Sequence, residues 1–335
     1  MFNEKVILIT GGTGSFGQNF TKRLLKTYNP KKIIIFSRDE YKQDLFRKYL
    51  TINMKDKVSK VRFFIGDVRD KSRLLRAFDG VDYVIHAAAM KQVPACEYNP
   101  IEAIKTNVYG AENIIDAALD RGVKKVIALS TDKAVNPVNL YGGTKLVSDK
   151  LFISANAYSR PTKTIFSIVR YGNVSGSRGS VIPYFKNLIT QGYTELPITD
   201  YEMTRFWISL DEGIDLVIKA IKESVGGEIY ISKIPSFKIV DLAYAMLPNA
   251  TTKEVGIREG EKLHEVMISK EDSRYTYEYD NYYIIYPNFD WLDISKYSKE
   301  GGVPLPYGFE YSSGNNKHWL NVEDLQKELH SLNLL

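Results

Sequence analysis

A glycine-rich turn near the N-terminus constrains the fold more than any other feature of the sequence. Residues 6–10 form a short apolar run typical of a buried strand, and the residues after the turn have the apolar spacing of a helix. Between them lie Gly11, Gly14 and Gly17, three residues apart. Glycines at this spacing allow a tight turn, the approach of a pyrophosphate to the backbone, and close packing of helix on strand. The turn therefore predicts a dinucleotide-binding α/β domain.

Apolar runs alternate with helical stretches through the first half of the chain. After the first run, strands are expected at residues 32–36, 61–70, 81–89, 126–129, 164–171 and 228–232. The strand at 61–70 has a polar end, and the strand at 81–89 ends in small residues. Long helices are expected at residues 100–121 and 210–224. Strands that alternate with helices predict a parallel, doubly wound α/β sheet of the Rossmann type.

The second expected strand ends in residues that distinguish two nicotinamide cofactors. Arg38 follows the strand and Lys42 lies nearby, and an arginine here suits the 2′-phosphate of NADP. An acidic residue at this position binds the 2′-hydroxyl of NAD, so the adjacent Asp39 leaves NAD as an alternative cofactor. We expect NADP. Asp67 is placed to accept a hydrogen bond from the adenine amino group. The residues expected at the cofactor are Gly11, Thr13, Gly14, Ser15, Phe16, Gly17, Ser37, Arg38, Lys42, Asp67, Val68, Ala87, Ala88, Ala89, Tyr141 and Lys145.

The alternation of strands and helices breaks after residue 172. We expect residues 1–172 to form the NADP-binding Rossmann domain, rejoined by about residues 206–232. Residues 173–205 and 233–335 are expected to form a smaller, interleaved α/β lobe. Such a lobe covers the open rim of the first domain and binds the substrate there.

The composition excludes several classes of protein. A formal net charge of +5 over 335 residues does not argue for nucleic-acid binding, but it suits a small anionic ligand such as a nucleotide. Cys96 is the single cysteine, so no intramolecular disulfide forms, and a cytoplasmic location is expected. The histidines lack metal-ligand spacing, and no apolar stretch approaches a membrane span in length. Neither a metal, a signal peptide nor a membrane anchor is expected.

The segment 130–145 contains the candidate catalytic side chains. Tyr141 and Lys145 are four residues apart and share one face of an expected helix. A lysine ammonium beside a phenol favours the phenolate, so we expect a lowered pKa for Tyr141, which can then accept a proton from a sugar hydroxyl. The end of the preceding strand adds Thr131, Asp132 and Lys133. Ligands bind at the carboxyl ends of parallel strands, so these side chains are expected to converge on one rim.

Together these features resemble an extended short-chain dehydrogenase/reductase. The resemblance narrows to the inverting UDP-N-acetylglucosamine 4,6-dehydratases that begin bacterial pseudaminic acid synthesis. It rests on Thr-Asp-Lys at 131–133 and on the segments 170–173, 176–180, 203–207 and 260–265, and it runs from Val6 to about His318. The related dehydratases that retain the configuration at C5 have Thr-Asp-Glu instead. Departures from the family pattern are Gln92, Gly143 (usually alanine), Ser175 and Glu259, none of which removes a catalytic group.

The resemblance implies elimination of water across C5 and C6 of a hexose, giving a UDP-2-acetamido-2,6-dideoxy-hexos-4-ulose. Tyr141 takes the 4-hydroxyl proton as C4 is oxidised, Lys145 holds the nicotinamide ribose, and Thr131 bonds the sugar oxygen. Lys133 removes the C5 proton, Asp132 protonates the leaving 6-hydroxyl, and hydride returns to C6. These roles require a lowered pKa for Lys133 and a raised pKa for Asp132.

Arginines in the second half of the chain favour binding of a nucleotide-sugar diphosphate. Arg205 and Arg258 can form charge-assisted contacts with phosphate oxygens, and Asn173 with the backbone around Gly179 is expected to hold the phosphate side. The residues expected at the substrate are Lys91, Asn173, Gly179, Ser180, Val181, Thr204, Arg205, Arg258 and Glu261. The family also suggests a homo-oligomer, either a hexamer or a dimer.

Three other functions share part of this pattern. A nucleotide-sugar 4-epimerase has the same tyrosine, lysine and glycine turn, but it needs no acid and base for C5 and C6, so Asp132 and Lys133 argue against it. A dehydratase that also epimerises at C3 stays open. A redox-sensing NADP-binding module without turnover is disfavoured by the intact Thr131, Tyr141 and Lys145.

Overall fold

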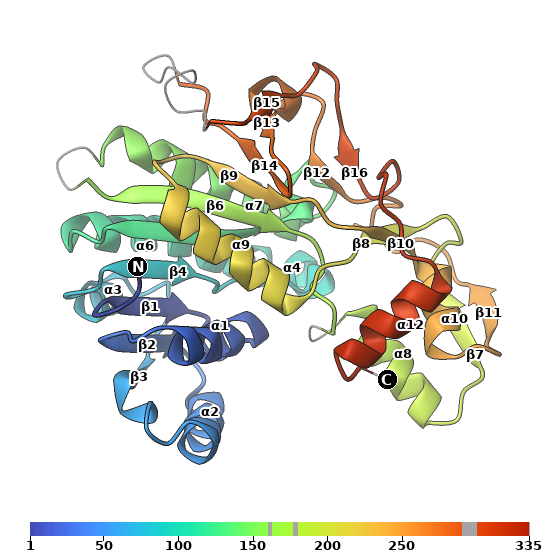
Figure 1. Ribbon diagram of the computed structural model, residues 1–335, viewed down its shortest axis with the longest axis horizontal. Helices are drawn as coiled ribbons and strands as arrows, with labels where there is room; N and C mark the ends of the chain where they lie inside the picture. The colour runs from blue at the N-terminus through green and yellow to red at the C-terminus, as the bar shows by residue number, and fades with distance from the viewer. Residues whose placement is uncertain (160–162, 177–179, 290–299, 335) are drawn as a thin grey trace.

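The computed structural model describes residues 1–159, 163–176, 180–289 and 300–334. Its centre is a ten-stranded sheet in the order β15-β13-β14-β9-β6-β5-β4-β1-β2-β3 (Figure 1). The parallel strands are β1 (Val6–Thr10), β2 (Lys32–Ser37), β3 (Val61–Ile65), β4 (Tyr83–His86), β5 (Lys125–Thr131), β6 (Ile165–Tyr171) and β9 (Ile229–Ser232). The expected doubly wound parallel sheet is confirmed.

Helices cover both faces of the sheet. On one face, α1 (Ser15–Thr27) packs against α9 (Leu210–Glu223), and α2 (Glu40–Asn53) lies beside β2 (Figure 1). A second helical layer is formed by α6 (Gly110–Asp120), which contacts α3 (Lys71–Ala77) and α7 (Leu140–Ser154). The expected long helix at 100–121 is built from α5 (Pro100–Ile104), the π-helical turn η2 (Lys105–Tyr109) and α6. Shorter helices are α4 (Val93–Tyr98), η1 (Val58–Lys60), η3 (Asp132–Ala134), η4 (Ala155–Ala157) and η5 (Asp272–Tyr275).

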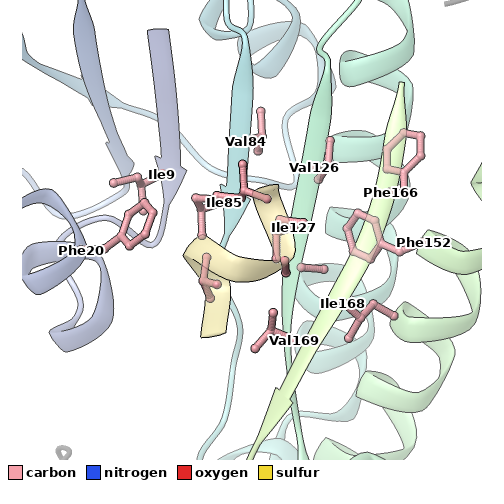
Figure 2. Close-up of a cluster of buried hydrophobic side chains, with 14 of the residues drawn as sticks. Ile9, Phe20, Val84, Ile85, Val126, Ile127, Phe152, Phe166, Ile168 and Val169 are labelled. Carbon is pink, nitrogen blue, oxygen red and sulfur yellow. The ribbon is translucent and has the colours of Figure 1, made fainter. Parts of the chain in front are cut away.

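The main core lies between the sheet and these helices. Figure 2 shows Ile9, Val84, Ile85, Val126, Ile127, Phe166, Ile168 and Val169 from the central strands, with Phe20 of α1 and Phe152 of α7 packed among them. All of these side chains are buried. A strand covered on both faces needs apolar residues at every position, which is why these strands read as continuous apolar runs.

An antiparallel extension completes the sheet. Strand β14 (Tyr282–Ile285) pairs with β9, β13 (Thr276–Glu278) pairs with β14, and β15 (Val303–Pro304) pairs with β13. The sequence analysis placed these residues in the second lobe, whereas the structure adds them to the edge of the main sheet. Their short, tyrosine-rich runs show neither the continuous apolar character of a parallel strand nor a clear alternation, so the pattern did not reveal the pairing.

A second, smaller core lies at the side of the sheet where the C-terminus ends (Figure 1). It includes Phe185, Leu196, Trp207, Leu242 and Leu325. Its helices are α8 (Val181–Thr190), α10 (Ile239–Met246) and α12 (Val322–Ser331). Its small sheets pair β7 (Glu195–Ile198) with β11 (Thr251–Glu254) and β8 (Thr204–Phe206) with β10 (Ser236–Lys238). A further two-stranded sheet pairs β12 (Val266–Ile268) with β16 (Tyr311–Ser312) and packs against the main core.

Candidate active site

A cavity of about 1080 Å³ runs along the carboxyl ends of the parallel strands. Its walls come from the β1–α1 turn, from the ends of β2 to β6, from α7, and from residues around α8 and the loop 258–262 of the second half of the chain. Every residue expected at the cofactor lines this cavity, as do Thr131, Lys133, Tyr141 and Lys145 of the expected catalytic set. The structure thus brings the two predicted groups of residues into one space, while their contacts with ligands stay predictions.

The β1–α1 turn has the geometry of a phosphate-binding site. Helix α1 begins at Ser15, its N-cap Gly14 has no side chain to cap the first backbone amides, and both residues line the cavity. A Cβ on Gly17 would lie 2.5 Å from the Cα of Gly12, so only glycine permits this turn to pack on the helix. Deeper in the same cavity, the buried Thr106 hydroxyl has no hydrogen-bond partner within the described ranges. These features fit a bound dinucleotide.

The end of β2 presents a cation to the cavity. The Arg38 side chain is 61% exposed, and its Nη1 lies 3.9 Å from Oδ2 of Asp67. Asp39 makes its contacts with α2 instead. Its carboxylate caps this helix by accepting from the Lys42 amide and pairs with the Lys42 ammonium at 2.8 Å. Burial acts to raise the pKa of Asp67, but hydrogen bonds from Arg69 outweigh it and keep that pKa below its usual range.

Helix α7 places Tyr141 and Lys145 on one cavity wall. The Asn139 side chain caps this helix by accepting from the Gly142 amide at 2.8 Å. Burial raises the pKa of Tyr141 to about 12, even though the nearby Lys133 charge acts to lower it. The expected lowering of the Tyr141 pKa is therefore wrong for the protein alone, because desolvation of the phenolate exceeds the help from neighbouring cations. Burial also lowers the pKa of Lys145.

Glycine at position 142 lets helix α7 approach the strand end closely. A Cβ there would lie 2.1 Å from the carbonyl oxygen of Lys133. The turn η3, which holds Asp132 and Lys133, therefore packs directly on α7. This contact brings the Thr-Asp-Lys segment next to Tyr141.

The carboxyl end of β5 holds a short hydrogen-bonded chain. The Thr131 hydroxyl donates to Oδ1 of Asp132 at 2.9 Å. The Lys133 ammonium donates to the same oxygen at 3.1 Å and to Oδ1 of Asn173 at 3.3 Å. Asp132 lies beneath the cavity wall with its side chain 1% exposed. Burial raises the pKa of Asp132, and the charge of Glu265 raises it further, in the direction that an acid requires.

The predicted lowering of the Lys133 pKa is wrong. Burial does act to lower it, but the negative charges of Asp132 and Glu265 outweigh burial and raise the pKa of Lys133 well above its ordinary value. Glu265 Oε1 lies 3.1 Å from Lys133 Nζ. The sequence showed only the adjacent Asp132, and the second carboxylate arrives from a distant part of the chain.

Most of the residues expected at the substrate also line the cavity. These are Lys91, Asn173, Ser180, Val181, Arg205, Arg258 and Glu261. Gly179 lies outside the described residues. Thr204 is buried away from the wall, where its hydroxyl lies 2.8 Å from His264 Nδ1 and 2.7 Å from Ser313 Oγ. It therefore supports the neighbouring Arg205 and does not line the cavity.

Two charged residues of the cavity wall were missed by the sequence analysis. Glu265 pairs with Lys133 and Arg205, and the Lys262 ammonium donates to the Val135 carbonyl at 2.5 Å. Both lie in the segment 260–265, which carried the family resemblance but suggested no role for either side chain. Their spacing from the strand end gave no signal, because only the tertiary fold brings this loop against η3.

His86 at the end of β4 and the single cysteine, Cys96, occupy structural positions. His86 is buried, with Nδ1 2.9 Å from the Thr10 hydroxyl, and burial lowers its pKa to about 3. Cys96 is buried in a small apolar cluster with Ala103 and Tyr141. Within the described ranges, no three His, Cys, Asp or Glu side chains are grouped to hold a metal ion. The same ranges contain no helix with the length and apolar character needed to cross a bilayer.

Comparisons with known sequences agree with this geometry. Residues 7–287 match the family described as polysaccharide biosynthesis protein. The chain is 58% identical over 330 residues to a UDP-N-acetylglucosamine 4,6-dehydratase (inverting) of Campylobacter jejuni, covering 97% of each chain. It is also 44% identical over 342 residues to a UDP-glucose 4-epimerase of Rickettsia akari, covering 100% of this chain and 98% of the relative.

Solved structures give the same picture of the fold. Pen from Bacillus thuringiensis superposes with a TM-score of 0.90 at 36% identity and covers 100% of both chains. The dTDP-glucose 4,6-dehydratase DesIV of Streptomyces venezuelae, solved with NAD and TYD bound, has a TM-score of 0.66 at 24% identity, covering 77% of this chain and 86% of DesIV. The second likeness supports the fold alone.

Proposed function

The chain belongs to the polysaccharide biosynthesis protein family, and from that premise we propose that it is a C5-inverting UDP-N-acetylglucosamine 4,6-dehydratase. The observation that carries this proposal is the meeting of two sets of groups at one cavity. Tyr141 and Lys145 on its wall suit oxidation at C4. Lys133 on the wall and Asp132 directly beneath it, 3.1 Å apart, add a base and an acid. Oxidation alone does not need the second set, whereas loss of water does.

The proposed sequence begins with oxidation of C4, which makes the C5 proton acidic. A bound nicotinamide dinucleotide supplies the acceptor and donor of hydride for C4 and C6. Tyr141 takes the proton of the 4-hydroxyl, and Thr131 orients the sugar oxygen. Lys133 then removes the C5 proton, and Asp132 protonates the departing 6-hydroxyl, so that one water leaves. Lys133 must first give up its own proton, which becomes easier when bound substrate removes its remaining 19% exposure.

NADP is the cofactor we propose. Arg38 faces the cavity with an exposed guanidinium, while Asp39 is held by its cap on α2. This arrangement supports binding of a 2′-phosphate over a 2′-hydroxyl. The residues proposed to hold the dinucleotide are those expected at the cofactor from the sequence, with α1 at the pyrophosphate and Asp67 at the adenine.

The remaining features of the proposal rest on the family resemblance. We propose a lyase of the hydro-lyase class that works in the cytoplasm as a homo-oligomer. Its 4-keto product would enter pseudaminic acid synthesis. For the substrate, Arg205 and Arg258 on the cavity wall support binding of the UDP diphosphate.

The second candidate is a nucleotide-sugar 4-epimerase, which the 44% identity to a Rickettsia relative of that name favours. One experiment separates the two. Incubation with UDP-N-acetylglucosamine and NADP⁺ should give a product that has lost one water by mass spectrometry. NMR in deuterated solvent should show inversion and deuterium at C5. A product of unchanged mass with inverted C4 would support the epimerase instead. Inversion at C3 in the dehydrated product would indicate a dehydratase that also epimerises at C3.

A further inference from the structure

Two carboxylates share the Lys133 ammonium. Asp132 Oδ1 and Glu265 Oε1 each lie 3.1 Å from Lys133 Nζ, and the two acidic side chains are 1% and 3% exposed. Two buried carboxylates in one site do not both ionise readily, because each negative charge raises the proton affinity of the other. One of them therefore serves as the counter-ion of Lys133, and the other is free to hold a proton.

The surroundings make Glu265 the counter-ion. Arg205 Nε lies 3.8 Å from the same Oε1 that contacts Lys133, so this carboxylate faces two cations. Burial acts to raise the pKa of Glu265, but the charges of Lys133 and Arg205 outweigh it and lower that pKa. The charged or titratable groups around Lys133 are Asp132, Glu265, Arg205, Lys262, Lys91 and Tyr141.

The surroundings of Asp132 favour the protonated form. Its Oδ1 accepts from Thr131 and Lys133. Among the residues that the structure describes, Oδ2 of Asp132 and Oε2 of Glu265 both lack a hydrogen-bond partner, so each carboxylate keeps one buried oxygen without a donor. The difference is in the cations: Glu265 faces Lys133 and Arg205, whereas Asp132 has only the shared Lys133 as an ion-pair partner. Asp132 is therefore the carboxylate that holds a proton at lower cost.

We propose that Glu265 is a positioning residue that neutralises Lys133 and thereby leaves Asp132 protonated as the acid for the leaving 6-hydroxyl. The proposal rests on the dehydratase function above. In the acid step, the O–H bond of Asp132 breaks and its proton goes to the 6-oxygen as the C6–O bond breaks. Lys133 enters this step as the neutral amine, having released one proton to solvent beforehand. The electrons of the C5–H bond form the C5–C6 double bond, and its proton goes to Lys133, which becomes the ammonium paired with Glu265. Water leaves, and Asp132 is left as a carboxylate.

Removal of the Glu265 charge tests this role. The rate of water loss from UDP-N-acetylglucosamine should be measured against pH for wild type, Glu265→Gln and Glu265→Asp. In Glu265→Gln the whole pH profile should move to lower pH by about 1–3 units, because a lost negative charge lowers the pKa of both Lys133 and Asp132. Glu265→Asp keeps the charge, so its profile should stay within about half a unit of wild type, whatever its maximal rate.

A matched control separates charge from packing. Glu228 is also buried, and it accepts from the Ser167 hydroxyl at 2.8 Å outside the cavity wall. Glu228→Gln should leave the position of the pH profile unchanged. A Glu265→Gln profile at the wild-type position overturns the proposal, as does an equal shift in Glu265→Asp.

A second measurement does not depend on the Glu265 variants or on turnover. Infrared spectra at neutral pH should show a protonated carboxyl band in wild type that disappears in Asp132→Asn. If wild type and Asp132→Asn give the same carboxyl bands, Asp132 is ionised and the proposal fails. Absence of water loss by the wild-type enzyme would contradict the dehydratase function, and the infrared comparison would still decide the charge of Asp132.

Discussion

The carbonyl oxygen of Lys133 lies 2.1 Å from the point that a Cβ on Gly142 would occupy. The backbone of the proposed base and the helix of the proposed phenolate are therefore in direct contact. The next residue, Gly143, has open space around the same position. Two neighbouring glycines of one helix thus differ completely in what a methyl group would meet.

This contrast gives the first prediction. Gly142→Ala should push η3 from α7, lower the free energy of unfolding by about 1–3 kcal/mol and reduce dehydration, because backbone gives way less easily than side chains. Gly143→Ala is the matched control and should raise the free energy of unfolding by about 0.5–1 kcal/mol, since alanine is favoured over glycine within a helix. Urea unfolding and product formation measure both effects. Equal stability of the two variants would contradict the close contact.

The second prediction concerns the Tyr141 phenol. With its pKa raised to about 12, the ionised fraction at neutral pH is small and increases as the pH rises. Single-turnover oxidation at C4 should therefore accelerate with pH, by up to about tenfold per unit below that pKa. Tyr141→Phe should lose about 10²–10⁴ in this rate and also lose its pH dependence. Retention of the slope in the variant would assign proton removal to another group.

The third prediction concerns cofactor preference. Arg38→Ala should lose about 1.5–3 kcal/mol of NADP affinity and little NAD affinity, because only NADP offers a phosphate to the guanidinium. Lys48→Ala is the control, since Lys48 lies on α2, pairs with Asp44 and does not line the cavity. Titration of both cofactors into the three proteins measures the effect. Equal losses of NADP and NAD affinity in Arg38→Ala would show that Arg38 does not contact the 2′-phosphate.

The fourth prediction separates oxidation from water loss. Lys133→Met should still oxidise C4, so the reduced cofactor accumulates in one turnover and is measured by its absorbance. It should neither release water nor exchange the C5 proton with deuterated solvent. Asp132→Asn should also stop before water loss but keep C5 exchange, because its proposed role is at the 6-hydroxyl. Wild-type exchange in Lys133→Met would place the base elsewhere, with Tyr141 as the next candidate.

Much of the fold could be predicted because buried parallel strands carry a strong pattern. Observed β1 and β9 agree with their expected ranges to within about one residue at each end, since continuous apolar runs end abruptly at polar or glycine residues. The β1–α1 turn followed from the glycine spacing together with the apolar run before it and the helical pattern after it. The pairing of β14 with β9 did not, because short antiparallel edge strands carry little periodic signal and are placed by contacts formed far along the chain.

The site could be predicted only where its residues are close in sequence. Thr131, Asp132 and Lys133 follow one expected strand, and Tyr141 lies in the first turn of the next helix. The sequence therefore predicted that these side chains converge on one rim. Glu265 was not, because its link to Lys133 exists only in three dimensions. The charge of Glu265 adds to that of the adjacent Asp132, and the two together outweigh burial and give the pKa of Lys133 the opposite sign to the one expected. Burial, which a sequence does not reveal, explains the wrong sign for Tyr141.

The pairing of β14 with β9 also bears on how such a chain can be divided. Residues 276–285 return to the sheet after the smaller core has begun, so the backbone crosses between the two regions more than once. A cut after β9 would expose the amide and carbonyl groups of its outer edge, where another strand could add and promote aggregation. Residues 1–232 are therefore not a self-contained unit, because without β14 the outer edge of β9 is left unpaired.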